Sequence, residues 1–250
     1  MEQSPTLHSS ELVRGLQERA ARALPAEHVK DSDGWTLRHA PGCSWWIGTA
    51  LPHGATGPDD LLRRVAEAEQ FYAAHGATAR FQLTPGASPA ALDPLLARRG
   101  YRRSGPISLQ VAGIAATPVA AQLTDHPTRG WFDTWSAARG HDDSAAEWDL
   151  LGRVDLPSAY VCLHEGSDVV AVGRAVADTG WAGVFGMATL PRARGRGAAR
   201  TVLATLANWA GAHGADRLYL QVERDNVAAM RLYQRAGFSE LCEYHYRTAD

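Results

Sequence analysis

The segment of this sequence best suited to chemistry is a turn rich in arginine and glycine, Arg192-Ala193-Arg194-Gly195-Arg196-Gly197. An apolar, strand-like segment precedes it, and an alanine-rich segment with helical spacing follows it. Glycines let the backbone approach an anion, the start of a helix presents unpaired N–H groups, and arginines add positive charge. The turn therefore predicts a phosphate or pyrophosphate site, although a solvated surface turn has the same composition. It is neither a lysine-bearing P-loop nor a G-x-G-x-x-G turn.

A second segment adds a candidate proton donor. Residues 226–238 follow a predicted strand at 218–222 and have the features of a helix, with Asn226 as its start signal and Gly237 as its stop signal. Tyr233 lies seven residues after Asn226, so both side chains fall on nearly the same face of the helix. Taken alone, Tyr233 also fits a core aromatic residue whose hydroxyl reaches the rim.

The two segments together carry a specific resemblance. Arg194-x-x-Gly197-x-Ala199 after a strand, followed by N-x-x-A-x-x-L-Y-x-x-x-G-F from Asn226, resembles the GNAT superfamily of acyl-CoA-dependent N-acyltransferases. The resemblance covers roughly residues 127–247, about half of the chain. A second register, starting at Arg192, also fits the first motif. We prefer Arg194 because Pro191 stands three residues before it, as is usual in the family.

The resemblance implies a mixed sheet that splays at its fourth strand, with acetyl-CoA as co-substrate in the opening. The backbone of residues 187–189 would pair with the pantetheine arm, residues 194–199 would hold the pyrophosphate, and the helix that starts at Asn226 would contact the arm. The cofactor-binding residues predicted in this way are Met187, Ala188, Thr189, Arg194, Gly195, Arg196, Gly197, Ala198, Ala199, Asn226 and Ala229.

The resemblance also implies a catalytic role for Tyr233. An amine attacks the thioester, and the phenol protonates the leaving thiolate, as the family tyrosine at this position does. The general base is not fixed by the sequence. Its candidates are Glu223, just after the 218–222 strand, and Asp142 or Asp143 in a polar loop, all of which also fit solvated surface charges.

Three residues are candidates for binding the acceptor. Arg174 stands in the middle of a predicted strand, where an arginine needs a partner or a cleft. It would hold a carboxylate of the acceptor or pair with a carboxylate such as Asp178. His141 and Asp142 belong to the polar loop, and His141 equally fits a loop histidine.

An internal repeat sets the expected architecture. Residues 73–77 resemble 211–215 at an offset of 138, and residues 95–101 resemble 232–238 at an offset of 137. We therefore predict an α/β (α+β) protein of two tandem GNAT-like domains, 1–116 and 117–250. Each would have a mixed, mostly antiparallel twisted sheet flanked by helices. The first copy has Leu96 in place of Tyr233 and lacks the arginines of the turn, so we expect only the second to be catalytic.

Several elements are also expected from local patterns. The sequence predicts short strands at 35–38 and 44–48, a helix at 58–76, a strand at 107–111 and a linker at 113–124. In the second half it predicts helices at 128–138 and 144–152 and strands at 159–164, 169–177 and 181–190.

Composition restricts the class of protein. The chain has 250 residues, 45% hydrophobic and 21% charged, with a formal net charge of −2, as in an ordinary soluble protein. We expect neither nucleic acid nor a membrane as partner, and a cytoplasmic location. The three cysteines give no disulfide framework and the ten histidines no metal-ligand spacing, so no metal is expected.

The leading hypothesis is an acetyl-CoA-dependent N-acetyltransferase that acts on a small-molecule amine, as a monomer or homodimer. The alternatives are a protein acetyltransferase that acts on a lysine or N-terminal amine, and a non-catalytic acyl-CoA-binding sensor. The acceptor and the length of the acyl group are not defined by the sequence.

Overall fold

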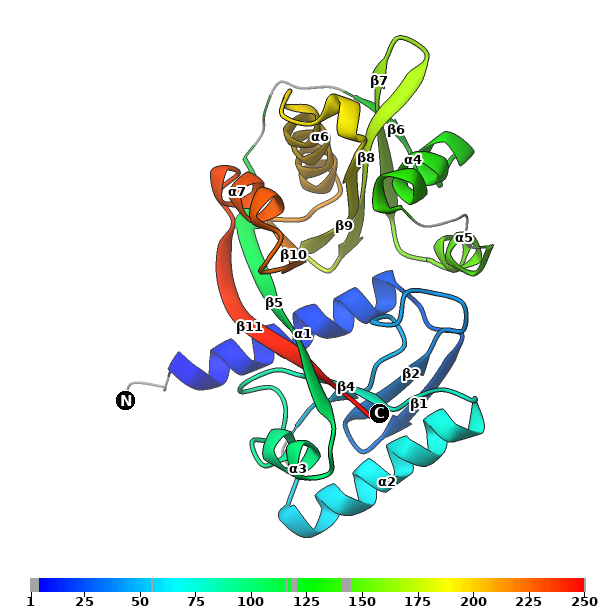
Figure 1. Ribbon diagram of the computed structural model, residues 1–250. Coiled ribbons are helices and arrows are strands. Elements are labelled where there is room, and N and C mark those ends of the chain that lie inside the picture. The colour runs from blue at the N-terminus through cyan, green and yellow to red at the C-terminus, as the bar shows by residue number, and fades with distance from the viewer. Residues whose placement is uncertain (1–4, 55, 116, 118–120, 141–144, 250) are drawn as a thin grey trace. The chain divides into compact units, whose positions relative to one another are not determined.

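The computed structural model describes residues 5–54, 56–115, 117, 121–140 and 145–249 (Figure 1). The chain forms two compact units. Unit 1 comprises Met1–Leu109, Glu223–Asp225 and Leu241–Asp250, and unit 2 comprises Gln110–Val222 and Asn226–Glu240. Both units are mixed α/β structures with sheets flanked by helices, so the predicted fold class is confirmed.

The two units do not coincide with the two domains predicted from the sequence, because the C-terminal segment belongs to unit 1. The predicted domains divide the chain once, after residue 116, whereas the units exchange strands. Strand β5 (Arg102–Gly113) passes from unit 1 into unit 2, and β11 (Ser239–Thr248) passes back from unit 2 into unit 1. The last ten residues therefore pack with the first half of the chain.

Unit 1 is built on two small sets of strands. A three-stranded antiparallel sheet has the order β1-β2-β3, and β11 pairs antiparallel with β4 from His245↔Leu83 to Thr248↔Arg80. Its elements are α1 (Pro5–Ala23), β1 (His28–Ser32), β2 (Trp35–His39), β3 (Leu51–Pro52), α2 (Pro58–Ala74), β4 (Arg80–Leu83) and α3 (Leu92–Arg98), with parts of β5 and β11.

In unit 1 one local prediction was wrong and one strand was missed. Residues 44–48 form a turn instead of a strand, in which the N–H of Ile47 donates to the carbonyl of Ser44. Ile47 is buried there, whereas Trp45 and Trp46 remain 43% and 37% exposed, so a run of three apolar residues does not alternate between two faces. Strand β1 was missed because its sequence, HVKDS, is polar and mostly exposed.

Unit 2 contains the larger sheet, with strand order β5-β10-β9-β8-β7-β6. Strands β6 to β9 pair antiparallel, and β10 runs parallel to β9. Its elements are β6 (Gln122–Thr124), α4 (Arg129–Arg139), α5 (Ala145–Gly152), β7 (Ser158–Glu165), β8 (Asp168–Asp178), β9 (Trp181–Thr189), the 3-10 turn η1 (Pro191–Ala193), α6 (Ala198–Ala212), β10 (Arg217–Glu223) and α7 (Val227–Arg235). The predicted linker contains β6.

The alternation of side chains on β8 gives the sheet of unit 2 two different faces. Ala171 and Ala175 point to one face and join a cluster of apolar residues from α6, among them Val202 and Leu206. Arg174 points to the other face, where α4 packs. Figure 1 shows α6 and α4 on opposite sides of β8 and β9.

The repeated segments have matching hydrogen bonds at the ends of α2 and α6. The Nδ1–H of His75 donates to the carbonyl of Phe71 over 2.8 Å, and that of His213 donates to the carbonyl of Trp209 over 2.9 Å. Because a carbonyl only accepts, the same histidine tautomer is fixed in both places.

The segments that follow α3 and α7 match as well. The N–H of Tyr101 donates to the carbonyl of Leu96, and the N–H of Phe238 donates to that of Tyr233, both over 3.0 Å. Gly100 and Gly237 occupy the preceding position with φ of +87° in each case, a conformation that favours glycine.

Candidate active site

The glycine- and arginine-rich turn forms the start of α6. After η1, the chain passes through Gly195 (φ +73°) and Gly197 (φ +86°), where only glycine is unstrained. Gly197 is the N-cap of α6, and no described side chain caps this helix. The N–H groups of the first helical turn are therefore directed at whatever lies beyond the helix start, an arrangement suited to an anion.

Strands β9 and β10 separate beside this turn. They pair in parallel from Trp181↔Arg217 to Gly183↔Tyr219, and the described residues beyond these show no further pairing. On its other side β9 stays paired with β8, with Ala188 opposite Val172. One backbone edge of the segment 185–189 thus remains open, and its side chains are half-buried. An extended arm of amide groups could hydrogen-bond to this edge as an added strand does.

The open edge, the turn and α7 line one pocket of about 1290 Å³. The pocket lies entirely within unit 2. Its volume accommodates a ligand larger than an ordinary small metabolite. It brings together most of the predicted site residues, namely Met187, Ala188, Thr189, Arg194, Gly195, Gly197, Ala198, Ala199, Asn226, Ala229 and Tyr233.

Tyr233 lies in the wall of this pocket and is 7% exposed. Its ring packs near Phe238, at 5.7 Å between ring centroids. Burial raises the pKa of the Tyr233 phenol to about 12, so it stays protonated at neutral pH. Asn226 caps α7, since its side-chain oxygen accepts from the N–H of Ala229 over 3.1 Å. The helix that carries Tyr233 therefore begins at a residue that also lines the pocket.

Arg196 and Arg174 lie elsewhere. The guanidinium of Arg196 pairs with Glu165 at 3.1 Å and does not line the pocket. Arg174 is 1% exposed on the face of the sheet that carries α4. Its guanidinium carbon lies 5.8 Å from the Tyr160 ring and 5.3 Å from the Phe185 ring. Burial lowers the pKa of Arg174, while a hydrogen bond with the Tyr160 phenol opposes this shift.

The structure does not bring Glu223 to the pocket. Glu223 ends β10, is exposed and belongs to unit 1. Its charge raises the pKa of Tyr246, which is also in unit 1, although burial is the main cause of that shift. His141, Asp142 and Asp143 lie outside the described residues.

Several arginines of the pocket were missed by the sequence analysis. Arg139 at the end of α4 stacks on Trp135 at 4.4 Å and also lines the pocket. Arg200, Arg231 and Arg235 line it from α6 and α7. The spacing of Arg231 and Arg235, one helical turn apart, was the only available signal, and it equally fits a solvated helix face.

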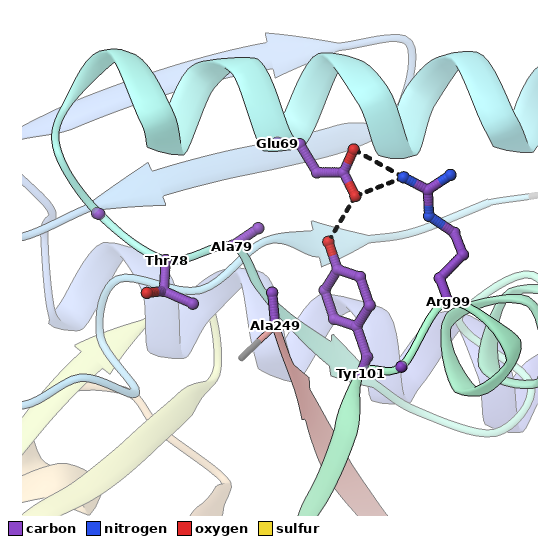
Figure 2. A pocket seen from close by; sticks show the side chains of 8 residues that line it. Glu69, Thr78, Ala79, Arg99, Tyr101 and Ala249 are labelled. Atoms are coloured by element: carbon purple, nitrogen blue, oxygen red, sulfur yellow. Dashed lines mark hydrogen bonds and ion pairs between the residues drawn. The ribbon is translucent and has the colours of Figure 1, made fainter.

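Unit 1 has a second pocket, of about 660 Å³, with a different chemistry (Figure 2). In it the carboxylate of Glu69 on α2 accepts hydrogen bonds from Arg99, at 2.8 and 2.9 Å, and from the Tyr101 hydroxyl, at 2.8 Å. Burial and this hydrogen bond raise the pKa of Tyr101. We call these three residues the polar clamp.

The offsets of the repeat relate the polar clamp to the pocket of unit 2. Glu69, Arg99 and Tyr101 correspond to residues 207, 236 and 238, which are Ala207, Ala236 and Phe238 and line the larger pocket. In unit 1 the ion pair of Glu69 and Arg99 thus joins α2 to the end of α3, whereas unit 2 has Ala207 and Ala236 at the corresponding positions.

The strand edge at Ala50 in unit 1 is already occupied. The N–H of Ala50 donates to the carbonyl of Arg80 over 2.8 Å, and its carbonyl accepts from the N–H of Gln82 over 2.9 Å. Its backbone groups are already used, so this position has no free strand edge.

The part of the chain that the structure describes has neither a membrane-spanning helix nor a metal-binding cluster. In residues 5–54, 56–115, 117, 121–140 and 145–249, no helix is long and apolar enough to span a membrane. In the same residues, no group of three or more His, Cys, Asp or Glu is arranged to hold a metal ion.

Comparisons with known proteins agree with this geometry. Residues 120–238 match the Acetyltransferase (GNAT) family. A Bacillus subtilis (strain 168) protein, "Uncharacterized N-acetyltransferase YobR", is 27% identical over 252 residues, which cover 94% of this chain and 98% of that protein. The match to this protein extends over both units.

Two solved structures are similar in fold over nearly the whole chain. A GCN5-related N-acetyltransferase from Kribbella flavida has a TM-score of 0.71 and 16% identity, covering 96% of this chain and 95% of that chain. A tandem GNAT protein from the clavulanic acid biosynthesis pathway has a TM-score of 0.57 and 14% identity, covering 96% and 87%.

Proposed function

We propose that the chain is a GNAT-type N-acetyltransferase, which transfers the acetyl group of acetyl-CoA to a primary amine of a small molecule. The observation that carries the proposal is the pocket of unit 2. It joins an open strand edge, an uncapped helix start and a buried, neutral phenol in a single cavity.

The residues present fit acetyl-CoA in two places. The backbone of Met187 to Thr189 would pair with the amides of the pantetheine arm. The N–H groups at the start of α6 and the guanidinium of Arg194 would hold the pyrophosphate. Each charge-assisted hydrogen bond contributes about 1.5–3 kcal/mol, so four or five are ample for micromolar affinity before the costs of association are subtracted.

Tyr233 would act as the general acid. The amine nitrogen attacks the thioester carbonyl carbon, the C–S bond breaks, and the phenol gives its proton to the leaving sulfur. The nitrogen loses a proton in the same turnover, and the phenolate regains one, so the enzyme ends as it began. A phenol of pKa about 12 keeps its proton until the thiolate forms.

The base and the acceptor contacts stay predictions from the sequence. Glu223 remains a candidate base, since it is an exposed carboxylate at the end of β10. Arg174 is proposed for an acceptor carboxylate, but at 1% exposure it would reach one only if Tyr160 or Phe185 moved. Its contacts favour a positioning role, in which it holds those two rings.

We further propose that the chain is a tandem repeat whose first copy does not bind acyl-CoA. The matching hydrogen bonds after α2 and α6, and after α3 and α7, support a common origin of the halves. The similarity to a tandem GNAT protein over 96% of the chain is consistent with this arrangement. The polar clamp and the paired backbone of Ala50 give the physical reason for the loss of binding.

The decisive experiment has two steps. Calorimetry with acetyl-CoA should give a micromolar dissociation constant, and a panel of small amines should then be screened for release of CoA thiol. No heat of binding at millimolar acetyl-CoA would refute the proposal. Thiol release with lysine peptides but with no small amine would indicate a protein acetyltransferase. Binding without thiol release on any amine would indicate a sensor.

A further inference from the structure

The pocket of unit 1 contains one pair of opposite charges. Of the residues that line it, Glu69 and Arg99 are the charged ones, and their side chains are 34% and 39% exposed. The volume of about 660 Å³ is within the range of small-molecule sites. Every residue of the lining belongs to unit 1. The pocket therefore has balanced charges, and both charged groups are accessible to a ligand.

The two charged groups keep part of their hydrogen-bonding capacity. Arg99 donates to both carboxylate oxygens of Glu69 through Nη2, and Figure 2 shows a single nitrogen of Arg99 directed at Glu69. Among the described residues, its Nε–H and Nη1–H groups have no partner. Two carboxylate oxygens offer about four acceptor sites, and Arg99 and Tyr101 together use three at Glu69. Arg99 can therefore bind an oxyanion, and Glu69 can accept one further N–H.

The fold itself does not require these charges. By the offsets of the repeat, the corresponding residues of unit 2 are Ala207 and Ala236. Unit 2 nevertheless keeps the hydrogen bond from the N–H of Phe238 to the carbonyl of Tyr233 at this place. A partly exposed ion pair also adds little to stability. The charges of unit 1 are therefore better explained by what they bind than by what they stabilise.

The charged pair selects a ligand that carries both charges close together. A simple carboxylate is attracted by Arg99 and repelled by Glu69, and a simple amine meets the reverse. An α-amino acid carries its ammonium and its carboxylate on one carbon, which matches two opposite charges whose nearest atoms are 2.8 Å apart. The planar donors of a guanidinium suit the carboxylate, and the carboxylate of Glu69 suits the ammonium.

The rest of the lining suits the side chain of such a ligand. Ala77, Ala79 and Ala249 contribute small apolar groups. We propose that this pocket is a binding site for a free α-amino acid with an apolar side chain, held through its carboxylate by Arg99 and through its ammonium by Glu69. The site goes beyond the proposed acetyl transfer and does not depend on it, because the two pockets have no residue in common.

The test uses calorimetry of the full chain without acetyl-CoA. The probes are L-alanine, L-valine, L-leucine and L-phenylalanine. For the tightest of these, two analogues follow, one without the amino group and one without the carboxylate. Each analogue loses the charge-assisted hydrogen bonds of one end, so each should bind at least about tenfold more weakly than the amino acid.

Variants of the charged pair assign the binding to this pocket. Arg99→Gln and Glu69→Gln should each weaken binding of the amino acid by at least about tenfold, and both should fold, since the pair is partly exposed. Glu69→Gln should also abolish the preference for the amino acid over the analogue without an amino group. Arg98→Gln is the matched control, because Arg98 is the exposed neighbour on α3 and does not line the pocket. It should leave the affinity unchanged.

Three results would overturn the proposal. The first is no heat of binding for any of the four amino acids at millimolar concentration. The second is wild-type affinity for either analogue equal to that for the amino acid, which would show that only one charge is recognised. The third is amino acid binding that is unchanged in both Arg99→Gln and Glu69→Gln, which would place the ligand elsewhere in the chain. Binding of acetyl-CoA is measured separately, so failure of this proposal leaves the proposed function intact.

Discussion

Tyr233 is the residue on which the proposed chemistry depends most directly. Its phenol is buried in the pocket wall with a pKa of about 12, so it is a proton donor throughout the physiological range. We expect Tyr233→Phe to lower kcat by about 10²–10⁴-fold, the usual contribution of a positioned general acid. The dissociation constant for acetyl-CoA should change by less than about threefold. Steady-state kinetics and calorimetry on the same preparation measure both quantities.

A matched control is available in unit 1. Tyr101→Phe also removes one phenol hydroxyl, and phenylalanine occupies the corresponding position 238 in the repeat. This variant should keep the wild-type kcat. Equal losses of kcat in both variants would mean that Tyr233 affects only folding, and an unchanged kcat in Tyr233→Phe would exclude it as the acid.

At the scale of residues, sequence motifs placed the backbone of the site better than its side chains. The resemblance to the GNAT superfamily implied eleven residues that now line one pocket. The glycine positions and helix starts among them are fixed by local geometry. They did not separate Arg194 from Arg196, because a sequence does not show that Glu165 lies beside Arg196. The burial of Arg174 under two aromatic rings likewise depends on contacts between distant segments.

At the scale of elements, β8 makes room for the pocket at Gly173. A Cβ added there would lie 2.5 Å from the Met187 Sδ and 2.7 Å from a Val202 methyl group. We expect Gly173→Ala to destabilise the protein by about 1–3 kcal/mol through overpacking. It should also weaken acetyl-CoA binding, because Met187 lines the pocket and must move. Thermal denaturation and calorimetry give the two values.

Gly130 provides the comparison for that substitution. It lies in helix α4, where an added Cβ would make an ordinary contact of 3.5 Å with Val169. Gly130→Ala should therefore be neutral or stabilising by up to about 1 kcal/mol, since alanine has the higher helix propensity. Equal stability of the Gly173→Ala and Gly130→Ala variants would mean that the site of Gly173 can accept a side chain. The absence of a side chain at Gly173 would then not be needed to keep Met187 in its position at the pocket.

Helices were easier to predict than strands in this chain. The helices predicted at 58–76, 128–138, 144–152 and 226–238 are present as α2, α4, α5 and α7, because apolar spacing and start or stop residues are local signals. Strand β1 was not predicted, because the polar sequence HVKDS shows no alternation of apolar and polar residues. Its backbone pairing with β2 is what makes it a strand. The exchange of β5 and β11 between units is a long-range property that no local pattern contains.

At the scale of the whole molecule, one buried histidine should make the stability of unit 1 depend on pH. His53 is 3% exposed, and it hydrogen-bonds through Nε2 to Gln17 at 2.8 Å. Burial lowers its pKa to about 4, while Glu18, at 3.7 Å, opposes the shift and Arg14 adds to it.

The sign of the effect follows from the order of protonation. The folded-state pKa lies below the unfolded value, so the unfolded chain takes up the proton first as the pH falls. Stabilisation by neutral His53 is complete above about pH 6.5 and is lost between 6.5 and 4, amounting to at most about 3 kcal/mol. Urea denaturation at pH 7 and 4.5 should show a larger loss for wild type than for His53→Gln. Equal losses would mean that His53 is not the titrating group.

The two units should differ in their capacity for acyl-CoA, so that each chain binds one molecule. In unit 1 the backbone of Ala50 is already paired, and the polar clamp occupies the positions that are Ala207, Ala236 and Phe238 in unit 2. Calorimetry should therefore give one site per chain.

Glu69→Ala should keep that stoichiometry, since removing a partly exposed ion pair alters stability by no more than about 1 kcal/mol and does not reopen the strands. A stoichiometry of two in the wild type would contradict the loss of binding in unit 1. A second site that appears only in Glu69→Ala would show that the clamp alone, and not the paired strand, prevents it.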